Sequence, residues 1–180
     1  IKDIAIGGGG RYLVFNTEDR ESLMIFDTSS AKIIHEIPYR DFYTVFAAGA
    51  EKLITVEPGF GRMTRWNLTT AERETSVQMA PTNGTFDIAM GYASNGPLLV
   101  SPLCTGGLHL YDIKTMRLIE MDSSGNSARR MPWPSPEGRA FGIFSEYVTI
   151  ENDSLRIFNK NLVDVYVLPH LPSRQIFTGK

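Results

Sequence analysis

The sequence LMIFDTSSAKIIHEI, from Leu23 to Ile37, contains a short apolar run, an aromatic residue, an aspartate, a polar turn and a second strand-forming run. The same order returns three times, as MTRWNLTTAERETSV from Met63, LHLYDIKTMRLIEM from Leu108 and LRIFNKNLVDVYVL from Leu155. The four aromatic residues are separated by 40, 45 and 47 residues, and they are Phe26, Trp66, Tyr111 and Phe158. The chain therefore contains an internal repeat of four units.

A second phrase, rich in turn-forming residues, precedes each copy. It reads GGGGR from Gly7, AGAEK from Ala48, ASNGP from Ala93 and SPEGR from Ser135. Gly, Asn and Pro supply the backbone angles of tight turns, so each phrase predicts a hairpin between two strands. The apolar anchors that follow these turns are Leu13, Leu53, Leu98 and Phe141. From anchor to aromatic residue the distance is 13 residues in three units and 17 in the fourth, which indicates a longer loop around Ser145–Ser154.

Each unit is interpreted as four antiparallel strands. The innermost strands are expected at Ile4–Ile6, Tyr43–Phe46, Phe86–Met90 and Arg130–Trp133. The Asp or Asn after each aromatic residue is expected to accept hydrogen bonds from backbone N–H groups two or three residues on, which fixes the turn into the fourth strand. Repeats of 40–50 residues built of short strands are typical of a β-propeller. We therefore predict an all-β propeller with blades at about 1–39, 40–80, 81–124 and 125–170.

The repeated phrases resemble bacterial WD40-like or YVTN-type propeller repeats. The closest matches are the pattern aromatic-Asp-x-x-(Ser/Thr)-x-Lys and the phrase Ser-Pro-Glu-Gly-Arg at 135–139. The resemblance covers almost the whole chain and implies the fold, not an activity. Two features depart from eukaryotic WD40 repeats, because no Gly-His dipeptide precedes the strands and the Trp-Asp dipeptide is replaced. The resemblance thus points to a divergent, bacterial-style subfamily.

Composition narrows the class of partner. The formal net charge is −2 at pH 7, and Arg129 and Arg130 are the only adjacent basic residues. A nucleic-acid surface needs clustered Lys and Arg, so nucleic acid is not expected as a partner. No apolar run has the length of a membrane-spanning helix, so membrane insertion of this segment is not expected either.

The two ends of the sequence suggest a longer propeller. The sequence opens directly on an expected inner strand, and residues 171–180 contain the run QIFT, which could begin a further blade. We expect a segment of a propeller with more than four blades. The remaining blades of the same chain would then be partners of this one, because exposed sheet faces would otherwise be left apolar.

An enzymatic alternative involves acidic residues near the starts of inner strands. Some propeller hydrolases of the lactonase and esterase type hold calcium in the central channel with such residues. The candidates by position here are Asp3, Asp41 and Asp87, although each can equally cap a strand or face solvent. Calcium needs several oxygen ligands that converge on one point, which spacing alone does not establish.

The preferred hypothesis is a non-catalytic platform that binds a protein or peptide through its rim loops, without a cofactor. Loops on a rigid scaffold commonly carry binding residues. The stretch from Ser123 to Pro134 is the most distinctive loop candidate, and it contains Arg129, Arg130 and Trp133. Trp and Arg are enriched among residues that dominate interface energies. A second candidate group is Arg62 and Arg65, beside Phe60.

Overall fold

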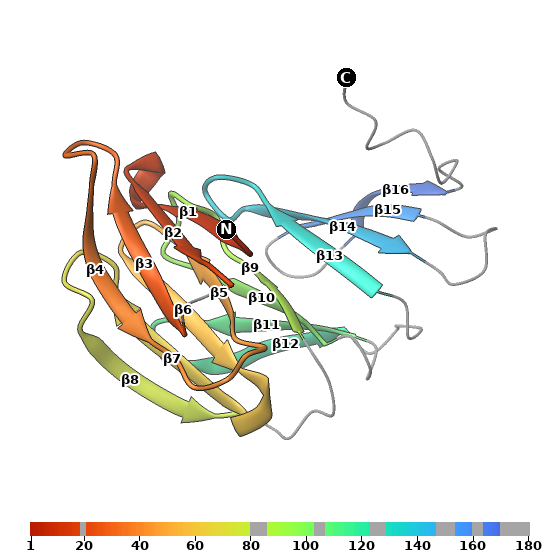
Figure 1. Ribbon diagram of the computed structural model, residues 1–180. Coiled ribbons are helices and arrows are strands. Elements are labelled where there is room, and N and C mark those ends of the chain that lie inside the picture. The colour runs from red at the N-terminus through yellow and green to blue at the C-terminus, as the bar shows by residue number, and fades with distance from the viewer. Residues whose placement is uncertain are drawn as a thin grey trace.

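A computed structural model shows four antiparallel sheets of four strands each, arranged as successive blades (Figure 1). The structure describes residues 1–18, 21–79, 86–102, 107–122, 129–146, 154–159 and 164–169. In each sheet the strands follow one another in sequence order, so every blade is a meander. The predicted all-β propeller architecture is confirmed. No helix among the described residues has the length and apolar character needed to cross a bilayer.

The strands of each blade run from the inner to the outer edge. The first blade contains β1 (Ile4–Gly7), β2 (Tyr12–Asn16), β3 (Ser22–Asp27) and β4 (Lys32–Pro38). The second contains β5 (Val45–Ala48), β6 (Lys52–Glu57), β7 (Arg62–Asn67) and β8 (Arg73–Gln78). The third contains β9 (Phe86–Ala89), β10 (Leu98–Pro102), β11 (Leu108–Asp112) and β12 (Arg117–Asp122). The fourth contains β13 (Arg129–Pro134), β14 (Ala140–Glu146), β15 (Ser154–Asn159) and β16 (Asp164–Pro169).

The repeated aromatic residue marks the same irregularity in all four blades. The register between the third and fourth strands shifts immediately before it, between Ile25 and Phe26 in the first blade and at the corresponding places in the others. A bulge of this kind increases the local twist of a blade. In the first three blades the Asp or Asn that follows behaves as expected: backbone N–H groups donate from Ser29 to Asp27 Oδ1 at 3.0 Å, from Thr69 and Thr70 to Asn67 Oδ1 at 2.9 and 3.0 Å, and from Lys114 to Asp112 Oδ1 at 2.8 Å.

Apolar side chains fill the spaces between blades, not one central core. The first cluster joins the first and second blades, and it includes Val14, Ile25 and Leu53. A second cluster joins the second and third blades, and Phe141 of the fourth blade packs with leucines of the third. Blades therefore bury apolar residues on both faces, as the continuous apolar runs in the sequence predict.

Neighbouring blades are also joined through the main chain of their inner turns. Gly8 N donates to Gly49 O at 2.8 Å, Ala50 N to Ser94 O at 2.7 Å, and Ala93 N to Pro136 O at 2.9 Å. The main chains of the third and fourth blades approach so closely that a Cβ on Gly91 would lie 2.4 Å from the carbonyl oxygens of Ser135 and Pro136, in the fourth blade's turn. These glycines thus serve close packing between blades as well as turn formation.

The inner strand of the second blade begins later than predicted. The expected range Tyr43–Phe46 is wrong by two residues, because Tyr43 lies in a turn and β5 starts at Val45. Asp41 holds this turn, since its carboxylate accepts hydrogen bonds from Tyr43 N at 2.9 Å and Gly59 N at 2.6 Å. The expected start of a further blade at residues 171–180 lies outside the described residues.

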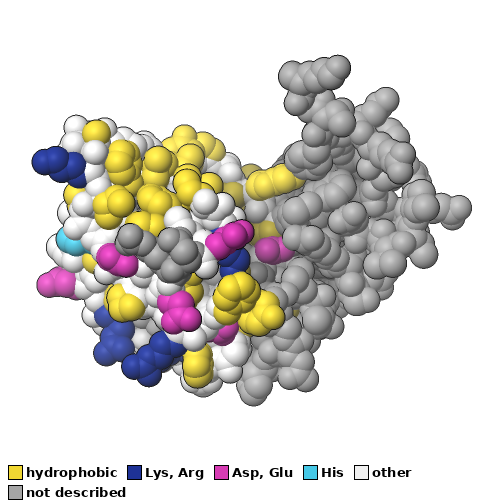
Figure 2. Space-filling view, in the orientation of Figure 1, with side chains coloured by type: hydrophobic (Ala, Val, Ile, Leu, Met, Phe, Trp, Pro, Cys, Tyr) yellow, Lys and Arg dark blue, Asp and Glu magenta, His cyan; other side chains and the backbone are white. Residues whose placement is uncertain are grey.

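The first blade exposes apolar side chains on the face that has no neighbouring blade. Ile4 is 56% exposed, Ile6 47% and Ile33 55%. Hydrophobic side chains gather over the region of β1 to β3 in the space-filling view (Figure 2). This face has the character of a blade interface.

Candidate binding groove between the first two blades

A groove of about 390 Å³ runs between the outer strands of the first and second blades. Side chains of both blades and of the β4–β5 connection form its walls. They are Leu23, Ile37, Pro38, Tyr39, Arg40, Thr55, Glu57, Arg62, Thr64, Trp66 and Arg73. A volume of this size is typical of sites that bind ligands or peptide side chains.

Strand alternation brings these side chains to one face of the second blade. Arg62, Thr64 and Trp66 are alternate residues of β7, so they point to the same side. Arg73 in β8 lies directly opposite Trp66 and shares that side. The floor on the first blade is apolar, because Leu23 and Ile37 form a buried cross-strand pair.

The carboxylate of Glu57 organises one end of the groove. Glu57 is only 5% exposed, and it accepts a hydrogen bond from Arg62 Nε at 2.6 Å and a longer one from Arg40 N at 3.4 Å. The guanidinium of Arg62 also lies 5.7 Å from the ring centroid of Phe60, beside which the sequence placed it. Glu57 therefore balances the charge of Arg62 and holds its side chain in place.

Two further arginines in the groove are not balanced in this way. Arg40 and Arg73 are exposed, and neither guanidinium forms a hydrogen bond or ion pair within the described part of the chain. Arg40 stands near the Glu57 end, whereas Arg73 stands at the Trp66 end. The groove thus has an available positive charge at each end and an apolar floor between them.

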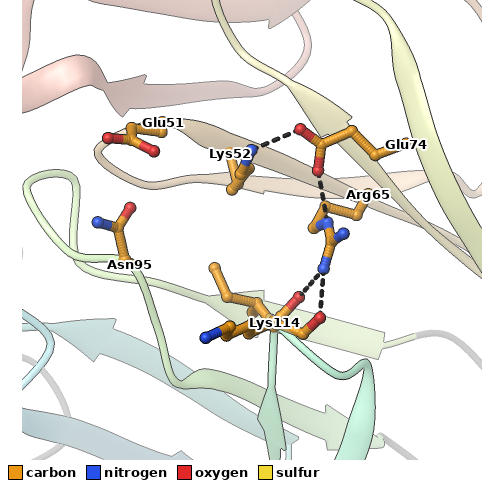
Figure 3. Close-up of a pocket in the computed structure, with 7 residues that line it drawn as sticks. Glu51, Lys52, Arg65, Glu74, Asn95 and Lys114 are labelled. Atoms are coloured by element: carbon orange, nitrogen blue, oxygen red, sulfur yellow. Dashed lines mark hydrogen bonds and ion pairs between the residues drawn. The ribbon is translucent and has the colours of Figure 1, made fainter.

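Arg65 has a different role from Arg62, although the sequence grouped the two together. It lies in a pocket of about 340 Å³ between the second and third blades (Figure 3). Its Nε donates to Glu74 Oε2 at 2.6 Å, and its Nη1 donates at 2.6 Å to the backbone oxygens of Ile113 and Lys114. Lys52 Nζ donates to the other oxygen of Glu74. The hydrogen bond from Lys52 and that from Arg65 lower the pKa of the Glu74 carboxyl.

The charged trio Lys52, Arg65 and Glu74 is particular to the second blade. Arg65 stands where the other blades have Ile25, Leu110 and Ile157, just before the register shift. Glu74 is the extra residue of the bulge, a place held by Ile34, Ile119 and Val165 elsewhere. Because the trio's charges are paired and Arg65 also binds the third blade's turn, we interpret it as a connection between blades.

The remaining binding candidates lie on an inner strand. The inner strand predicted at Arg130–Trp133 is confirmed as β13, which spans Arg129–Pro134, so these residues belong to a strand and not to a rim loop. Trp133 is 46% exposed there. Among the side chains that the structure describes, Trp133 lines neither the groove of Arg62 nor the pocket of Arg65.

The three aspartates of the metal hypothesis do not share one site. Asp3 and Asp87 line a small pocket of about 160 Å³ beside the inner strands, whereas Asp41 is buried and engaged with the turn before β5. Among the described residues no three His, Cys, Asp or Glu side chains lie close enough to hold a metal ion. Within that part of the chain, the geometry supplies no converging set of oxygen ligands.

Sequence reasoning missed Arg40 and Arg73, the two arginines that the groove leaves available. Arg73 follows Trp66 by seven residues, and the bulge in β8 is what places it opposite the indole. Arg40 lies in a connection whose course depends on the turn at Asp41. Neither position carries a repeat signal, so only the folded arrangement identifies them.

Comparison with known proteins agrees with the fold. No protein-family model matches the chain, and no curated protein matches its sequence. Among solved structures, hydrazine synthase of Kuenenia stuttgartiensis aligns over 93% of this chain with a TM-score of 0.67 and 15% identity. Hsv2 of Kluyvelomyces marxianus aligns over 88% with a TM-score of 0.59 and 13% identity. The dihydro-heme d1 dehydrogenase NirN, solved in complex with DHE, aligns over 95% with a TM-score of 0.61 and 12% identity.

These neighbours are β-propellers, and at such low identity they show the fold alone. The described residues therefore form four four-stranded blades of a β-propeller. It spans 48%, 46% and 38% of the length of the three solved chains, respectively.

Proposed function

We propose that this propeller is a non-catalytic interaction platform that binds a segment of a protein partner in the groove between its first two blades. One observation carries the proposal: the groove holds two exposed arginines, Arg40 and Arg73, with no charged partner in the described part of the chain. Arginine and aromatic residues dominate many protein interfaces, and Trp66 and Tyr39 line the same groove.

Most residues of this groove belong to strands, not to the rim loops that the sequence suggested. Trp66 Nε1 donates to Thr55 Oγ1 at 3.0 Å, and the hydroxyls of Thr64 and Ser76 lie 2.8 Å apart. His35 Nε2 and Thr69 O, 2.7 Å apart, hydrogen-bond between the two blades beside the groove. A preformed wall lowers the entropy lost on binding, which favours recognition of a flexible partner segment.

An unbiased peptide selection tests the platform. The chain is immobilised, and a display library of random short peptides is selected on it without regard to charge. We expect enriched peptides that compete with one another and whose affinity falls in the double variant R40A/R73A. Arg117 is an exposed residue of β12 that does not line the groove, so R117A is the matched control. An absence of enriched peptides, or binding indifferent to the double variant, would refute the platform.

We further propose that the open face of the first blade is covered by a further blade of the same propeller. The exposed Ile4, Ile6 and Ile33 support this, as does the greater length of the propellers to which the chain is similar. With this face open, the chain should bind a hydrophobic dye. The variant I4S/I6S should reduce that fluorescence, and unchanged fluorescence would contradict the assignment.

A further inference from the structure

We infer that the groove recognises an acidic segment in extended conformation, with two carboxylates on the same side of the strand, four residues apart. This inference rests on the proposed function and specifies its partner. It comes from the placement of charge along β7 and β8, and from the neutral surface between the two charged ends.

The spacing of the two ends follows from strand geometry. Arg62 and Trp66 are four residues apart on β7, and Arg73 is paired with Trp66 across to β8. At about 3.3 Å per residue, Arg62 and Trp66 are roughly 13 Å apart along β7, and we take this as the distance between the Glu57 end, where Arg40 lies, and the Trp66 end, where Arg73 lies. Residues one and five of an extended peptide have the same separation and point to the same side. A bound segment parallel to β7 can therefore present one carboxylate to each end.

The charges of the groove favour an anionic partner. Three arginines and one glutamate line it, and the glutamate is already bound by Arg62. Arg40 and Arg73 remain available to donate hydrogen bonds to carboxylates of a partner. Arginine binds carboxylates through two parallel hydrogen bonds, which gives direction as well as attraction.

The middle of the groove favours a small apolar residue at position three of the segment. Leu23 and Ile37, beneath the groove, are 0% and 2% exposed, so the accessible apolar surface comes from the half-buried Tyr39 and Trp66, with Thr64 between Arg62 and Trp66 on β7. A third charge at this position would lose its hydration against an apolar surface. The expected pattern is acidic, any, small apolar, any, acidic.

A protein segment fits these observations better than a nucleic acid. A single-stranded nucleic acid binds along a continuous positive groove with stacking surfaces at each base. Here the positive charge is confined to the two ends, and the buried carboxylate of Glu57 lies at one of them. The net charge of the chain, −2, also gives no general attraction for a polyanion.

The test uses fluorescein-labelled peptides and fluorescence anisotropy with the full chain. The probe is Gly-Ser-Glu-Ser-Val-Ser-Glu-Ser-Gly, and its isomer Gly-Ser-Ser-Glu-Glu-Val-Ser-Ser-Gly has the same composition with adjacent glutamates. In the probe both carboxylates point to one side, whereas in the isomer they point to opposite sides. We expect the probe to bind about tenfold more tightly than the isomer, and the affinity to fall as salt is raised. Equal affinity for the two peptides would overturn the spacing.

Reversing the charge of Arg73 provides the decisive experiment. R73E should weaken binding of the probe about tenfold, and replacing one glutamate of the probe by arginine should restore affinity for R73E alone. Arg73 has no partner in the described part of the chain, so the variant should fold normally, which thermal melting can check. R117E is the control and should leave the affinity unchanged. Failure of the swapped peptide to recover binding would refute direct pairing with Arg73.

The outcomes separate this inference from the broader proposal. If the unbiased selection yields neutral or basic peptides whose affinity still falls in R40A/R73A, the platform stands and the acidic pairing is wrong. If no peptide binds in the groove, both fail. If single-stranded DNA displaces the probe at equal or lower concentration, the assignment to a protein segment is wrong.

Discussion

The guanidinium of Arg11 binds the carboxylate of Asp27 through two hydrogen bonds: Nε donates to Oδ1 at 3.1 Å, and Nη2 donates to Oδ2 at 3.0 Å. Asp27 is the repeated acidic residue after Phe26, and its Oδ1 also accepts the backbone N–H of Ser29 at 3.0 Å. The pair therefore joins the inner turn of the first blade to the turn between its outer strands.

This pair predicts a change of stability in acid. The hydrogen bond from Arg11 lowers the pKa of Asp27 from 3.8 to about 2. A carboxyl whose pKa is lower in the folded state than in the unfolded state stabilises the fold at pH values above the unfolded-state pKa. That contribution disappears as the pH falls through the folded-state pKa, about 2. Asp27→Asn should melt at a lower temperature than the native chain at pH 7, and the two melting temperatures should converge between pH 4 and pH 2.

The matching position of the second blade provides a reference for that variant. Asn67 holds its turn without a charge, so Asn at position 27 should preserve the turn and remove only the ion pair. Arg11→Met should therefore lower the melting temperature at pH 7 to a similar extent. A difference between Asp27→Asn and the native chain that persists at pH 2 would show that the turn itself had changed.

Close packing of the inner turns predicts a large effect of a single methyl group. In Gly91→Ala the new Cβ would lie 2.4 Å from the carbonyl oxygens of Ser135 and Pro136, which are main-chain atoms and cannot rotate away. We expect a loss of about 3 kcal/mol in the free energy of unfolding, measured in urea. Gly9→Ala is the control, because no atom lies within 4 Å of its Cβ and only its left-handed φ of 66° is unfavourable. That control should lose about 1 kcal/mol.

For the charged trio of the second blade, we predict that replacing Glu74 alone destabilises the fold, whereas replacing all three residues together does not. Glu74→Ile alone leaves Lys52 and Arg65 without their carboxylate, and we expect a loss of about 1–2 kcal/mol because the Glu74 side chain is only 23% exposed. Introducing the first blade's residues at all three positions, K52Y/R65I/E74I, should return the free energy of unfolding to within about 1 kcal/mol of the native value. Urea unfolding of both variants measures this, and additive losses would show that the three residues act independently.

The turn after the repeated Asp or Asn predicts opposite effects of glycine at two equivalent positions. Ala31 and Met116 both adopt left-handed φ angles, of 53° and 58°. Ala31 is exposed, so Ala31→Gly should relieve strain and stabilise the chain by about 0.5 kcal/mol. Met116 is 5% exposed within the apolar cluster between blades, so Met116→Gly should instead destabilise by about 2 kcal/mol. Thermal melting of the two variants should show shifts of opposite sign.

Much of the architecture could be predicted because the determining signals are local. The turn glycines, the aromatic residue and the Asp or Asn after it act within a few residues of one another, and each blade repeats them. The late start of β5 could not be predicted, since Asp41 extends the turn by binding the distant backbone of Gly59. A hydrogen bond between a side chain and the backbone of a residue distant in sequence produces no repeating pattern from which it could be predicted.

The candidate site was less accessible to sequence reasoning. Arg62 and Arg65 were singled out together, yet they are three residues apart on a strand and therefore face different neighbouring blades. Arg62 lines the groove and Arg65 binds the next blade's backbone. The available charge belongs to Arg40 and Arg73, whose meeting depends on how two blades pack.

The hydrogen bonds between inner turns have an evolutionary consequence. Each of them joins main-chain atoms, so cohesion along this edge depends on backbone shape and on a few small residues, and little on the identity of outward-facing side chains. Lineages could therefore diverge widely over the surface while neighbouring blades stayed joined. Under the proposed function, a new ligand preference could arise by exchanging a few arginines of the groove without endangering the scaffold.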